Sequence, residues 1–360
     1  MIRVSYDAQI FRRQRRGGIS RYFAELMRAF IVEPSLGVQP VFRSHLVASR
    51  HLREAGLGHH WVVHPRILGY AESTLMSSQR THRGADIIHH TYYSPRGLER
   101  SWSTPRVTTI HDMIPELMPQ FFPMGNPHLA KREYVAQSGG LIFVSETSRR
   151  DLFRLYGPQD IPTAVAHLAP GQQFYPRPSV STRGSQFVLF VGHRGGYKEF
   201  GTLLNALYRV RSNALMLCAV GGGPFNDEEV THIRKLGLVA RVRQESADDE
   251  TLATLYSSAL ALVVPSVYEG FGLPVVEAMA SGCPVVLSDT DVFREIAADV
   301  AQFFPTYDID ALADALNRIS EDAEMRQSNG QRGLVRARDF TWERTAQATA
   351  DLYREVLQNN

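Results

Sequence analysis

The strongest constraint on the fold is the stretch from residue 260 to residue 282, which predicts a buried strand, a tight turn and a short helix. Pro265 ends the apolar run 260–264, and Gly270 and Gly272 then allow a turn in which the backbone approaches a ligand closely. Pro274 suits the first turn of a helix that Gly282 can end. A strand that feeds a helix in this way is the unit of an α/β fold.

Two carboxylates bracket this turn. Glu269 lies just before the glycines, and Glu277 lies about one turn into the helix. A helix N-terminus favours anions, so the site suits a ligand that carries phosphate as well as hydroxyl groups, such as a nucleotide sugar. The alternative is a buried turn with two solvated glutamates. It would explain either residue alone, but the complete strand–turn–helix pattern disfavours it.

The run E-G-F-G-L-P-V-V-E-A-M-A-S-G resembles the signature of family 4 retaining glycosyltransferases. This resemblance implies an α/β chain with the GT-B fold, in which two Rossmann-like domains face each other across a cleft. It also implies a retaining hexosyltransferase in which Glu277 binds the ribose and Glu269 binds the sugar of the donor. The remaining donor-binding groups of this turn would be Gly270, Phe271, Gly272 and Leu273.

Length and composition fit two domains. The chain has 360 residues, of which 44% are hydrophobic and 21% are charged, as in ordinary globular enzymes. A shift towards Pro, Gly, Ser and Gln marks the boundary between the domains. We expect an N-terminal Rossmann-like acceptor domain at 1–172, a linker at 173–185 and a donor domain at 186–340. The C-terminal helix, 341–360, is expected to cross back to the first domain.

The first strand, 1–6, leads into an arginine-rich loop over 11–18 and a helix from residue 19. In the family this loop lies over the donor phosphates or the acceptor, which assigns Gly17 and Gly18 to donor binding. A simple turn is the alternative for this glycine pair. The arginines between residues 12 and 16 fit a solvated loop, a contact with anionic lipid or a contact with a pyrophosphate-linked acceptor, and the sequence leaves these open.

His111 follows the apolar strand 107–110, so it is expected at the carboxyl end of a parallel strand, where α/β folds bind ligands. The resemblance implies that this histidine contacts the donor sugar or its phosphate. His89 and His90 end another strand, but neighbouring residues on a strand point to opposite faces and give a weaker signal.

The loop after strand 187–191 supplies the predicted cations. Family members have a lysine at the position of Lys198 and an arginine nearby. His193 and Tyr197 occupy two common positions of that arginine, so Arg194 is taken as its substitute. Two cations here would stabilise the charge of a departing diphosphate. The turn 221–224 would lie beside the nucleotide base.

Several classes of protein and site are disfavoured. The net charge of +2, from 39 basic and 37 acidic residues, does not suggest a nucleic acid partner. Cys218 and Cys283 lie in or beside apolar runs and indicate buried thiols in a reducing compartment. Asp289-Thr290-Asp291 has the letters of a metal-binding motif but follows a different strand, so no metal and no cofactor are expected. Without a signal-peptide core or an apolar span, a cytoplasmic protein is predicted, with peripheral contact at the inner membrane face.

The segments R-G-G-Y-K and T-I-H-D-M-I-P-E resemble mannosyltransferases of surface polysaccharide assembly. The resemblance therefore implies transfer of a hexose, with mannose from GDP-mannose favoured, to a saccharide or lipid-linked saccharide acceptor. A nucleotide-sugar epimerase of the same fold and a catalytically idle nucleotide-sugar-binding module are the alternatives. The glutamate pair together with Lys198 argues against the idle module, since binding alone does not need a leaving-group cation.

Overall fold

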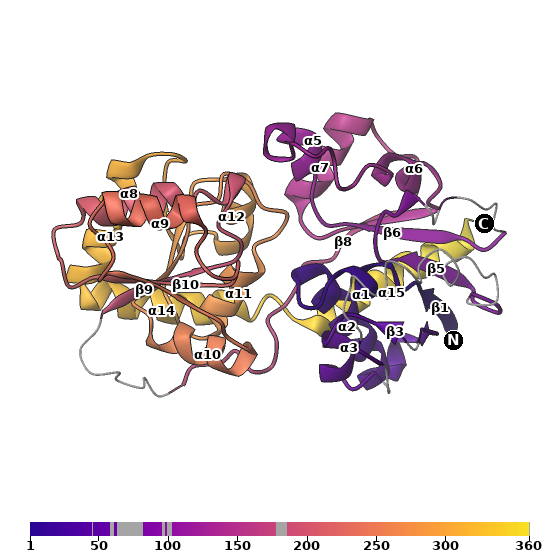
Figure 1. Ribbon diagram of the computed structural model, residues 1–360. Coiled ribbons are helices and arrows are strands. Elements are labelled where there is room, and N and C mark those ends of the chain that lie inside the picture. Colours follow the sequence, from indigo (N-terminus) through magenta and orange to yellow (C-terminus); the bar gives the residue numbers. More distant parts are fainter. Residues whose placement is uncertain are drawn as a thin grey trace. The chain divides into compact units, whose positions relative to one another are not determined.

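The computed structural model describes residues 1–44, 46–57, 61–62, 82–95, 98, 103–177 and 186–359. The chain forms two compact units (Figure 1). Unit 1 comprises Met1–Leu168 together with Thr341–Asn360, and unit 2 comprises Ala169–Phe340. Each unit contains one six-stranded sheet, and every pairing within the two sheets is parallel.

The sheet of unit 1 has the strand order β2-β1-β5-β6-β7-β8, so the order reverses between β1 and β5. The strands are β1 (Ile2–Tyr6), β2 (Val38–Phe42), β5 (Ile87–His90), β6 (Arg106–Ile110), β7 (Gly140–Phe143) and β8 (Thr163–Val165). A separate short pair is formed by β3 (Leu46–Val47) and β4 (Trp61–Val62). The α-helices are α1 (Gln9–Arg13), α2 (Gly18–Val32), α3 (His51–Glu54), α5 (Ile114–Leu117), α6 (Lys131–Ala136), α7 (Glu146–Tyr156) and α15 (Trp342–Gln358). The described part of the unit also contains two 3-10 helices, η1 (Pro34–Leu36) and η4 (Pro119–Phe121).

The arginine-rich segment after β1 differs from the prediction, because its first part is helical. The predicted loop over 11–18 begins inside α1. Ile10 and Phe11 are both buried, with exposed fractions of 1% and 0%, and this apolar pair fixes one helical turn against the core. The loop proper starts at Gln14.

The C-terminal helix α15 packs in unit 1 against α2, β7 and β8. Its buried face carries Tyr353, whose hydroxyl lies 2.9 Å from the Tyr6 hydroxyl and 2.6 Å from His89 Nδ1. His89 Nε2 in turn lies 2.8 Å from Thr109 Oγ1. Burial lowers the pKa of His89 to about 3, so the ring is neutral and both of its nitrogens are used within the core.

The sheet of unit 2 has the order β11-β10-β9-β12-β13-β14, which is the doubly wound order with its reversal between β9 and β12. The strands are β9 (Phe187–Val191), β10 (Met216–Val220), β11 (Val242–Glu245), β12 (Ala261–Val264), β13 (Val285–Ser288) and β14 (Gln302–Phe304). The helices are η5 (Gly196–Lys198), α8 (Phe200–Arg209), α9 (Asp227–Lys235), α10 (Asp249–Ser258), α11 (Leu273–Ala280), α12 (Asp291–Ala297), α13 (Ile309–Glu321) and α14 (Ala323–Ala337).

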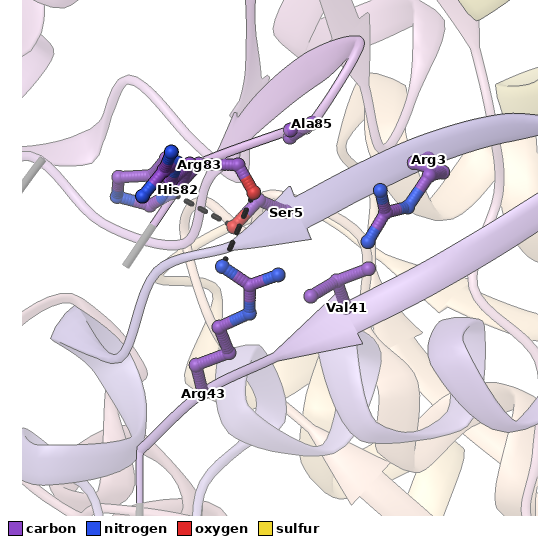
Figure 2. Close-up of a pocket in the computed structure, with 8 residues that line it drawn as sticks. Arg3, Ser5, Val41, Arg43, His82, Arg83 and Ala85 are labelled. Atoms are coloured by element: carbon purple, nitrogen blue, oxygen red, sulfur yellow. Dashed lines mark hydrogen bonds between the residues drawn. The ribbon is translucent and has the colours of Figure 1, made fainter. Parts of the chain in front are cut away.

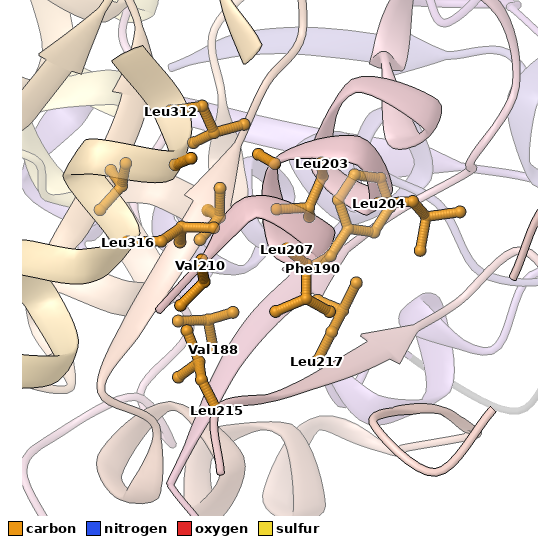
Figure 3. Close-up of a cluster of buried hydrophobic side chains, with 14 of the residues drawn as sticks. Val188, Phe190, Leu203, Leu204, Leu207, Val210, Leu215, Leu217, Leu312 and Leu316 are labelled. Atoms are coloured by element: carbon orange, nitrogen blue, oxygen red, sulfur yellow. The ribbon is translucent and has the colours of Figure 1, made fainter. Parts of the chain in front are cut away.

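Helices cover both faces of this second sheet, with α8, α9 and α13 on one side and α10, α11 and α14 on the other (Figure 1). The apolar faces of α8 and α13 close over β9 and β10 in one core cluster (Figure 3). Leu203 and Leu207 of α8 are fully buried there, as are Leu312 and Leu316 of α13. This two-sided burial explains why the strands read as continuous apolar runs.

The connection between the units lies earlier than the predicted linker. The division falls between Leu168 and Ala169, and residues 173–177 already belong to unit 2. Phe174 is buried with its ring 5.8 Å from that of Tyr256, and Arg177 pairs with Glu250. An aromatic anchor and an ion pair therefore hold this segment to α10. The rest of the predicted linker, 178–185, lies outside the described residues.

Both cysteines are buried and unpaired. Burial raises the pKa of Cys218 to about 11 and that of Cys283 to about 12, so both remain thiols at neutral pH. Within the described ranges, no helix has the combination of length and apolar character that crossing a membrane requires.

Candidate active site

The reversal of strand order in unit 2 defines where a ligand can bind. β9 and β12 are parallel neighbours, with Leu262 paired to Leu189, so the loops that follow both strands leave the same edge of the sheet. In doubly wound sheets the crevice for the ligand lies at this point. A backbone hydrogen bond of 2.9 Å from Val267 N to Tyr197 O joins the two loops.

The two loops bring Lys198 and Glu269 together. Lys198 Nζ donates to Glu269 Oε1 at 2.5 Å, although the residues are 71 positions apart in the chain. The two side chains are 19% and 14% exposed, so the pair is reachable from solvent but shielded from it. A shielded cation beside a carboxylate offers both a partner for phosphate and an acceptor for hydroxyl groups.

The glycine turn shapes the start of α11. Gly272 has φ +95, and a Cβ atom added there would lie 3.0 Å from Phe293 Cε1, so both conformation and space require glycine. Gly270 and Phe271 are buried, and Leu273 is the first residue of α11.

The N-cap residue of α11, Gly272, has no side chain with which to cap the helix, and the first turn contains no acidic residue. By contrast, Asn226 and Asp248 cap α9 and α10 with side-chain hydrogen bonds. The positive end of α11 is thus left for an anion from outside the helix.

Glu277 is the more deeply buried of the two signature carboxylates, with an exposed fraction of 2%. The Tyr256 hydroxyl, from α10, lies 3.3 Å from its Oε2 atom. The sequence did not reveal this partner, because Tyr256 lies in a helix 21 positions earlier with no motif around it. The side chain of Glu277 is therefore held in place by α10.

Arg194 is placed differently from the prediction. Its guanidinium donates to Glu229 Oε1 at 2.8 Å and Oε2 at 3.2 Å, to Gly221 O at 2.5 Å and to Pro224 O at 2.9 Å. It also lies 4.9 Å above the Phe225 ring, and its side chain is only 3% exposed. Four of its five N–H groups are used inside the protein, so Arg194 does not present a free charge for a diphosphate.

The prediction also placed the turn 221–224 beside the nucleotide. All three of its glycines have positive φ angles, between 69° and 91°. A Cβ atom at Gly222 would come within 2.7 Å of Arg194 Nη1. Arg194 thus joins the loop after β9 to the loop after β10, and Glu229 of α9 fixes its position.

The remaining predicted site residues belong to unit 1. Gly17 and Gly18 form the start of α2, where Gln14 Oε1 accepts a hydrogen bond from Ser20 N at 3.2 Å and Gly17 N donates to His51 Nε2 at 3.3 Å. A Cβ atom at Gly17 would collide with Gln14, whereas Gly18 has open space around it. Two of the nearby arginines are engaged, Arg13 over the Tyr92 ring and Arg16 with Glu54.

His111 follows β6 as predicted and is 8% exposed. Its ring packs edge-on against Tyr22 and Phe23 of α2, at 5.3 and 5.7 Å between centroids. Burial lowers the pKa of His111 to about 3, so the imidazole is neutral at physiological pH. It can contact a sugar or phosphate only as a neutral hydrogen-bonding group and not as a cation.

Two further features, the Asp289 segment and a small hollow in unit 1, do not contribute to the candidate active site. Asp289 forms a two-pronged ion pair with Arg294 at 2.6 and 2.8 Å, and among the described residues no group of His, Cys, Asp and Glu is arranged to hold a metal ion. Figure 2 shows a small basic hollow in unit 1, where Arg43 donates to the backbone oxygen of Arg83 and Ser5 faces His82. None of the predicted site residues lines this hollow.

Comparison with known proteins places the chain in a family. Residues 172–335 match the family of glycosyl transferases group 1. The O-antigen chain mannosyltransferase B of Escherichia coli is 29% identical over 301 residues, which cover 75% of this chain and 74% of the relative. The D-inositol 3-phosphate glycosyltransferase of Kribbella flavida is 30% identical over 308 residues, which cover 76% and 72%.

Among solved structures, sucrose-phosphate synthase of Thermosynechococcus elongatus aligns over 100% of both chains with a TM-score of 0.77 and 21% identity. Two α/β units, each built on a parallel six-stranded sheet, define the GT-B class of glycosyltransferase. The chain belongs to the group 1 glycosyltransferase family.

Proposed function

We propose that the protein transfers a hexose, with mannose favoured, from a nucleotide-sugar donor to a hydroxyl group of a saccharide acceptor, with retention of configuration. GDP-mannose is the favoured donor and a lipid-linked saccharide of surface glycan assembly the favoured acceptor. This acceptor would bring the protein into peripheral contact with a membrane. The name of the Escherichia coli relative, an O-antigen chain mannosyltransferase, supports this choice of sugar and pathway class.

The observation that carries the proposal is the Lys198–Glu269 pair at the strand reversal of unit 2, next to the start of α11, whose N-cap residue is a glycine. A diphosphate placed against the N–H groups of Gly270 to Leu273 would meet the positive end of α11. Lys198 would then exchange Glu269 for the phosphate, since both are anionic partners for one ammonium group. The charge that develops on the leaving diphosphate would be stabilised without further movement.

The two glutamates take different parts in this proposal. Glu269, released from Lys198, would accept hydrogen bonds from the hydroxyl groups of the donor sugar. Glu277, which is held by α10, would bind the ribose hydroxyls. A front-face attack by the acceptor hydroxyl needs no second carboxylate, because the leaving phosphate oxygen can accept the proton.

A donor panel tests the function. Purified protein is incubated with GDP-mannose, UDP-glucose and related donors, with and without lipid-linked saccharide acceptors. We expect nucleotide release that depends on the acceptor, and a product whose anomeric configuration by NMR equals that of the donor. Conversion or hydrolysis of the donor that does not depend on any acceptor would favour the epimerase. Binding without turnover would favour the idle module.

Metal removal gives a second test. Since Lys198 and the α11 N-terminus already face the proposed diphosphate position, we expect activity to survive treatment with EDTA. The measurement is the transfer rate before and after dialysis against the chelator, with Mg²⁺ or Mn²⁺ added back as the control. A strict requirement for either ion would contradict the proposed role of Lys198.

A further inference from the structure

The carboxyl edge of the sheet in unit 1 has two carboxylates in contrasting states. Asp7 follows β1 and lies at the strand reversal. It accepts hydrogen bonds from the backbone and side chain of both Gln9 and Thr91, and it lies 2.8 Å from His90 Nδ1. Both carboxylate oxygens of Asp7 therefore accept hydrogen bonds within the protein, and these bonds hold two loops together, so Asp7 is structural.

Asp112, which follows β6, is only partly used. Its Oδ1 atom accepts from Ile114 N at 3.1 Å, and its side chain is 18% exposed. In the part of the chain that the structure describes, Oδ2 has no hydrogen-bond partner. Burial alone would raise the pKa of Asp112, but neighbouring groups, among them the Lys131 charge and the hydrogen bond from Ile114 N, outweigh it and hold the pKa below its usual value. The group is an ionised carboxylate with one open oxygen at the carboxyl end of a strand.

A buried ion pair fixes the loop that carries Asp112. Lys131 of α6 is fully buried, and its Nζ donates to Glu116 Oε2 at 2.9 Å and to the Asp112 backbone oxygen at 2.8 Å. The other oxygen of Glu116 is 3.2 Å from Asn126 Nδ2 and 3.3 Å from the Tyr156 hydroxyl. These groups satisfy one another's hydrogen bonds, and Glu116 neutralises the Lys131 charge. Lys131 therefore holds the loop in place and does not bind a ligand.

His128 stands next to Asp112 with an unused nitrogen. Its ring makes edge contacts with Tyr92 and Tyr93, at 5.4 and 5.2 Å between centroids. Its Nδ1 atom is buried 3.8 Å from Asp112 Oδ1, and no hydrogen-bond partner for it exists among the described residues. Burial lowers the pKa of His128, so the ring is neutral. If Nδ1 carries the proton and faces the carboxylate, the lone pair of Nε2 is left as an acceptor.

The charges around this pair favour a neutral ligand. Glu116 is balanced by Lys131, at 2.9 Å, whereas Asp112 keeps its negative charge. The negative charge on Asp112 would repel an anion, whereas a hydroxyl group can donate a hydrogen bond to its open Oδ2 atom. We propose that Asp112 and His128 bind neighbouring hydroxyl groups of the acceptor saccharide. This inference rests on the proposed function and adds His128 to the site.

The first test is direct and needs no turnover. Full-length protein labelled with [15N]histidine is titrated with methyl α-D-mannopyranoside and, separately, with methyl α-D-glucopyranoside. His128 is assigned from the spectrum of His128→Gln. We expect a neutral ring protonated at Nδ1 whose Nε2 resonance shifts on saccharide addition, and we expect Asp112→Asn to remove that shift. An Nε2–H tautomer, no shift with either glycoside, or a shift with inorganic phosphate alone would overturn the proposal.

The second test uses partition between transfer and hydrolysis. Nucleotide release from the donor is compared with glycoside formation on methyl α-D-mannopyranoside. Asp112→Asn keeps an oxygen that can accept the hydrogen bond from Ile114 N, so the turn after β6 is expected to form as in the wild type. Asp112→Asn and His128→Gln are each expected to lower the transfer-to-hydrolysis ratio about 10- to 100-fold. His232→Gln, in a pair with Asn205 on unit 2, is the matched histidine control and should leave the ratio unchanged.

The two tests separate the two levels of the proposal. Failure of the wild-type protein to release nucleotide from any donor would contradict the proposed function. The NMR titration with methyl glycosides would still show whether Asp112 and His128 bind a saccharide. Normal donor turnover with an unchanged transfer-to-hydrolysis ratio in both variants would overturn this inference alone.

Discussion

Lys198 and Glu269 neutralise each other across the strand reversal, so neither can be changed without altering the other. Lys198→Ala would leave Glu269 as a shielded charge without its partner, in addition to removing the cation for the leaving group. We expect kcat/KM to fall about 100- to 1000-fold, as when a donor to a developing anion is lost. The measurement is steady-state kinetics with the preferred donor.

A double-mutant cycle tests the coupling. The loss in Lys198→Ala/Glu269→Gln should be smaller than the sum of the two single losses, because the double variant leaves no unpaired charge. Arg209→Ala/Asp310→Asn, an exposed ion pair of the same unit, is the control and should show little coupling. Unchanged turnover in Lys198→Ala, or strict additivity in the cycle, would contradict the assignment.

Arg194 is expected to act through the loop that it holds. Arg194→Lys keeps the charge but cannot make the four hydrogen bonds to Glu229, Gly221 and Pro224. The turn 221–224 should loosen, so KM for the donor should rise several-fold while kcat changes less.

Arg241→Lys provides the matched control. This arginine also binds backbone oxygens, those of Leu215 and Ser212, but at the opposite, amino-terminal end of the strands. It should lower stability without changing donor KM. A large fall in kcat of Arg194→Lys at constant KM would instead support direct contact with the leaving group.

At the scale of elements, the sequence predicts best where burial is two-sided. β9 and β12 are continuous apolar runs, and their observed bounds agree with the predicted ones within one residue. The start of α11 was equally predictable, because glycine and proline restrict the backbone whatever surrounds them. These local signals located the turn that carries Glu269.

Elements that depend on distant partners could not be predicted. β11, with the sequence V-R-Q-E, is an edge strand in which only Val242 is buried, so it shows no apolar run. The spacing placed Arg194 in the correct loop but could not show that Glu229, 35 positions later, occupies its guanidinium. The burial of Lys131 beside Glu116 has no local signal either.

The end of α12 stores strain that a single change can relieve. Ala298, the C-cap residue, has φ 49 and ψ −119, a conformation that side chains with a Cβ atom rarely adopt. Ala298→Gly should raise the free energy of unfolding of unit 2 by about 1 kcal/mol, since the relieved strain exceeds the extra chain entropy. Urea unfolding followed by circular dichroism measures it.

Ala311→Gly, inside α13, is the control for the same chemical change in ordinary helical backbone. It should lower the free energy of unfolding by about 1 kcal/mol. Equal destabilisation by both substitutions would show that the Ala298 conformation is not strained.

At the scale of the whole molecule, the chain leaves unit 1 after Leu168 and returns to it at Thr341. Tyr353 of the returning helix supplies the hydroxyl that faces His89 Nδ1 in the core. Unit 1 is therefore completed only by the last residues of the chain, whereas unit 2 is one continuous segment. The three tryptophans, Trp61, Trp102 and Trp342, all fall in the sequence of unit 1, so tryptophan fluorescence reports on that unit.

Unit 1 should lose stability in mild acid. Burial lowers the pKa of both His89 and His111 from 6.5 to about 3. Between these values the unfolded chain binds a proton at each ring and the folded unit does not, so stability is full above pH 6.5 and falls as the pH drops towards 3. From pH 7 to pH 5 each histidine should cost about 2 kcal/mol of unfolding free energy. The lowered pKa values of His82 and His128 act in the same direction.

The measurement is urea unfolding followed by tryptophan fluorescence at pH 7, 6 and 5. We expect the midpoint to fall steadily over this range. His111→Asn removes one of these titrating rings. Its midpoint at pH 7 should be lower than that of the wild type, but its free energy of unfolding should fall by about 2 kcal/mol less between pH 7 and pH 5. A midpoint that does not change over this range in the wild-type protein would mean that these rings are protonated or solvated in the folded state. The neutral-imidazole role assigned to His111 would then fail with it.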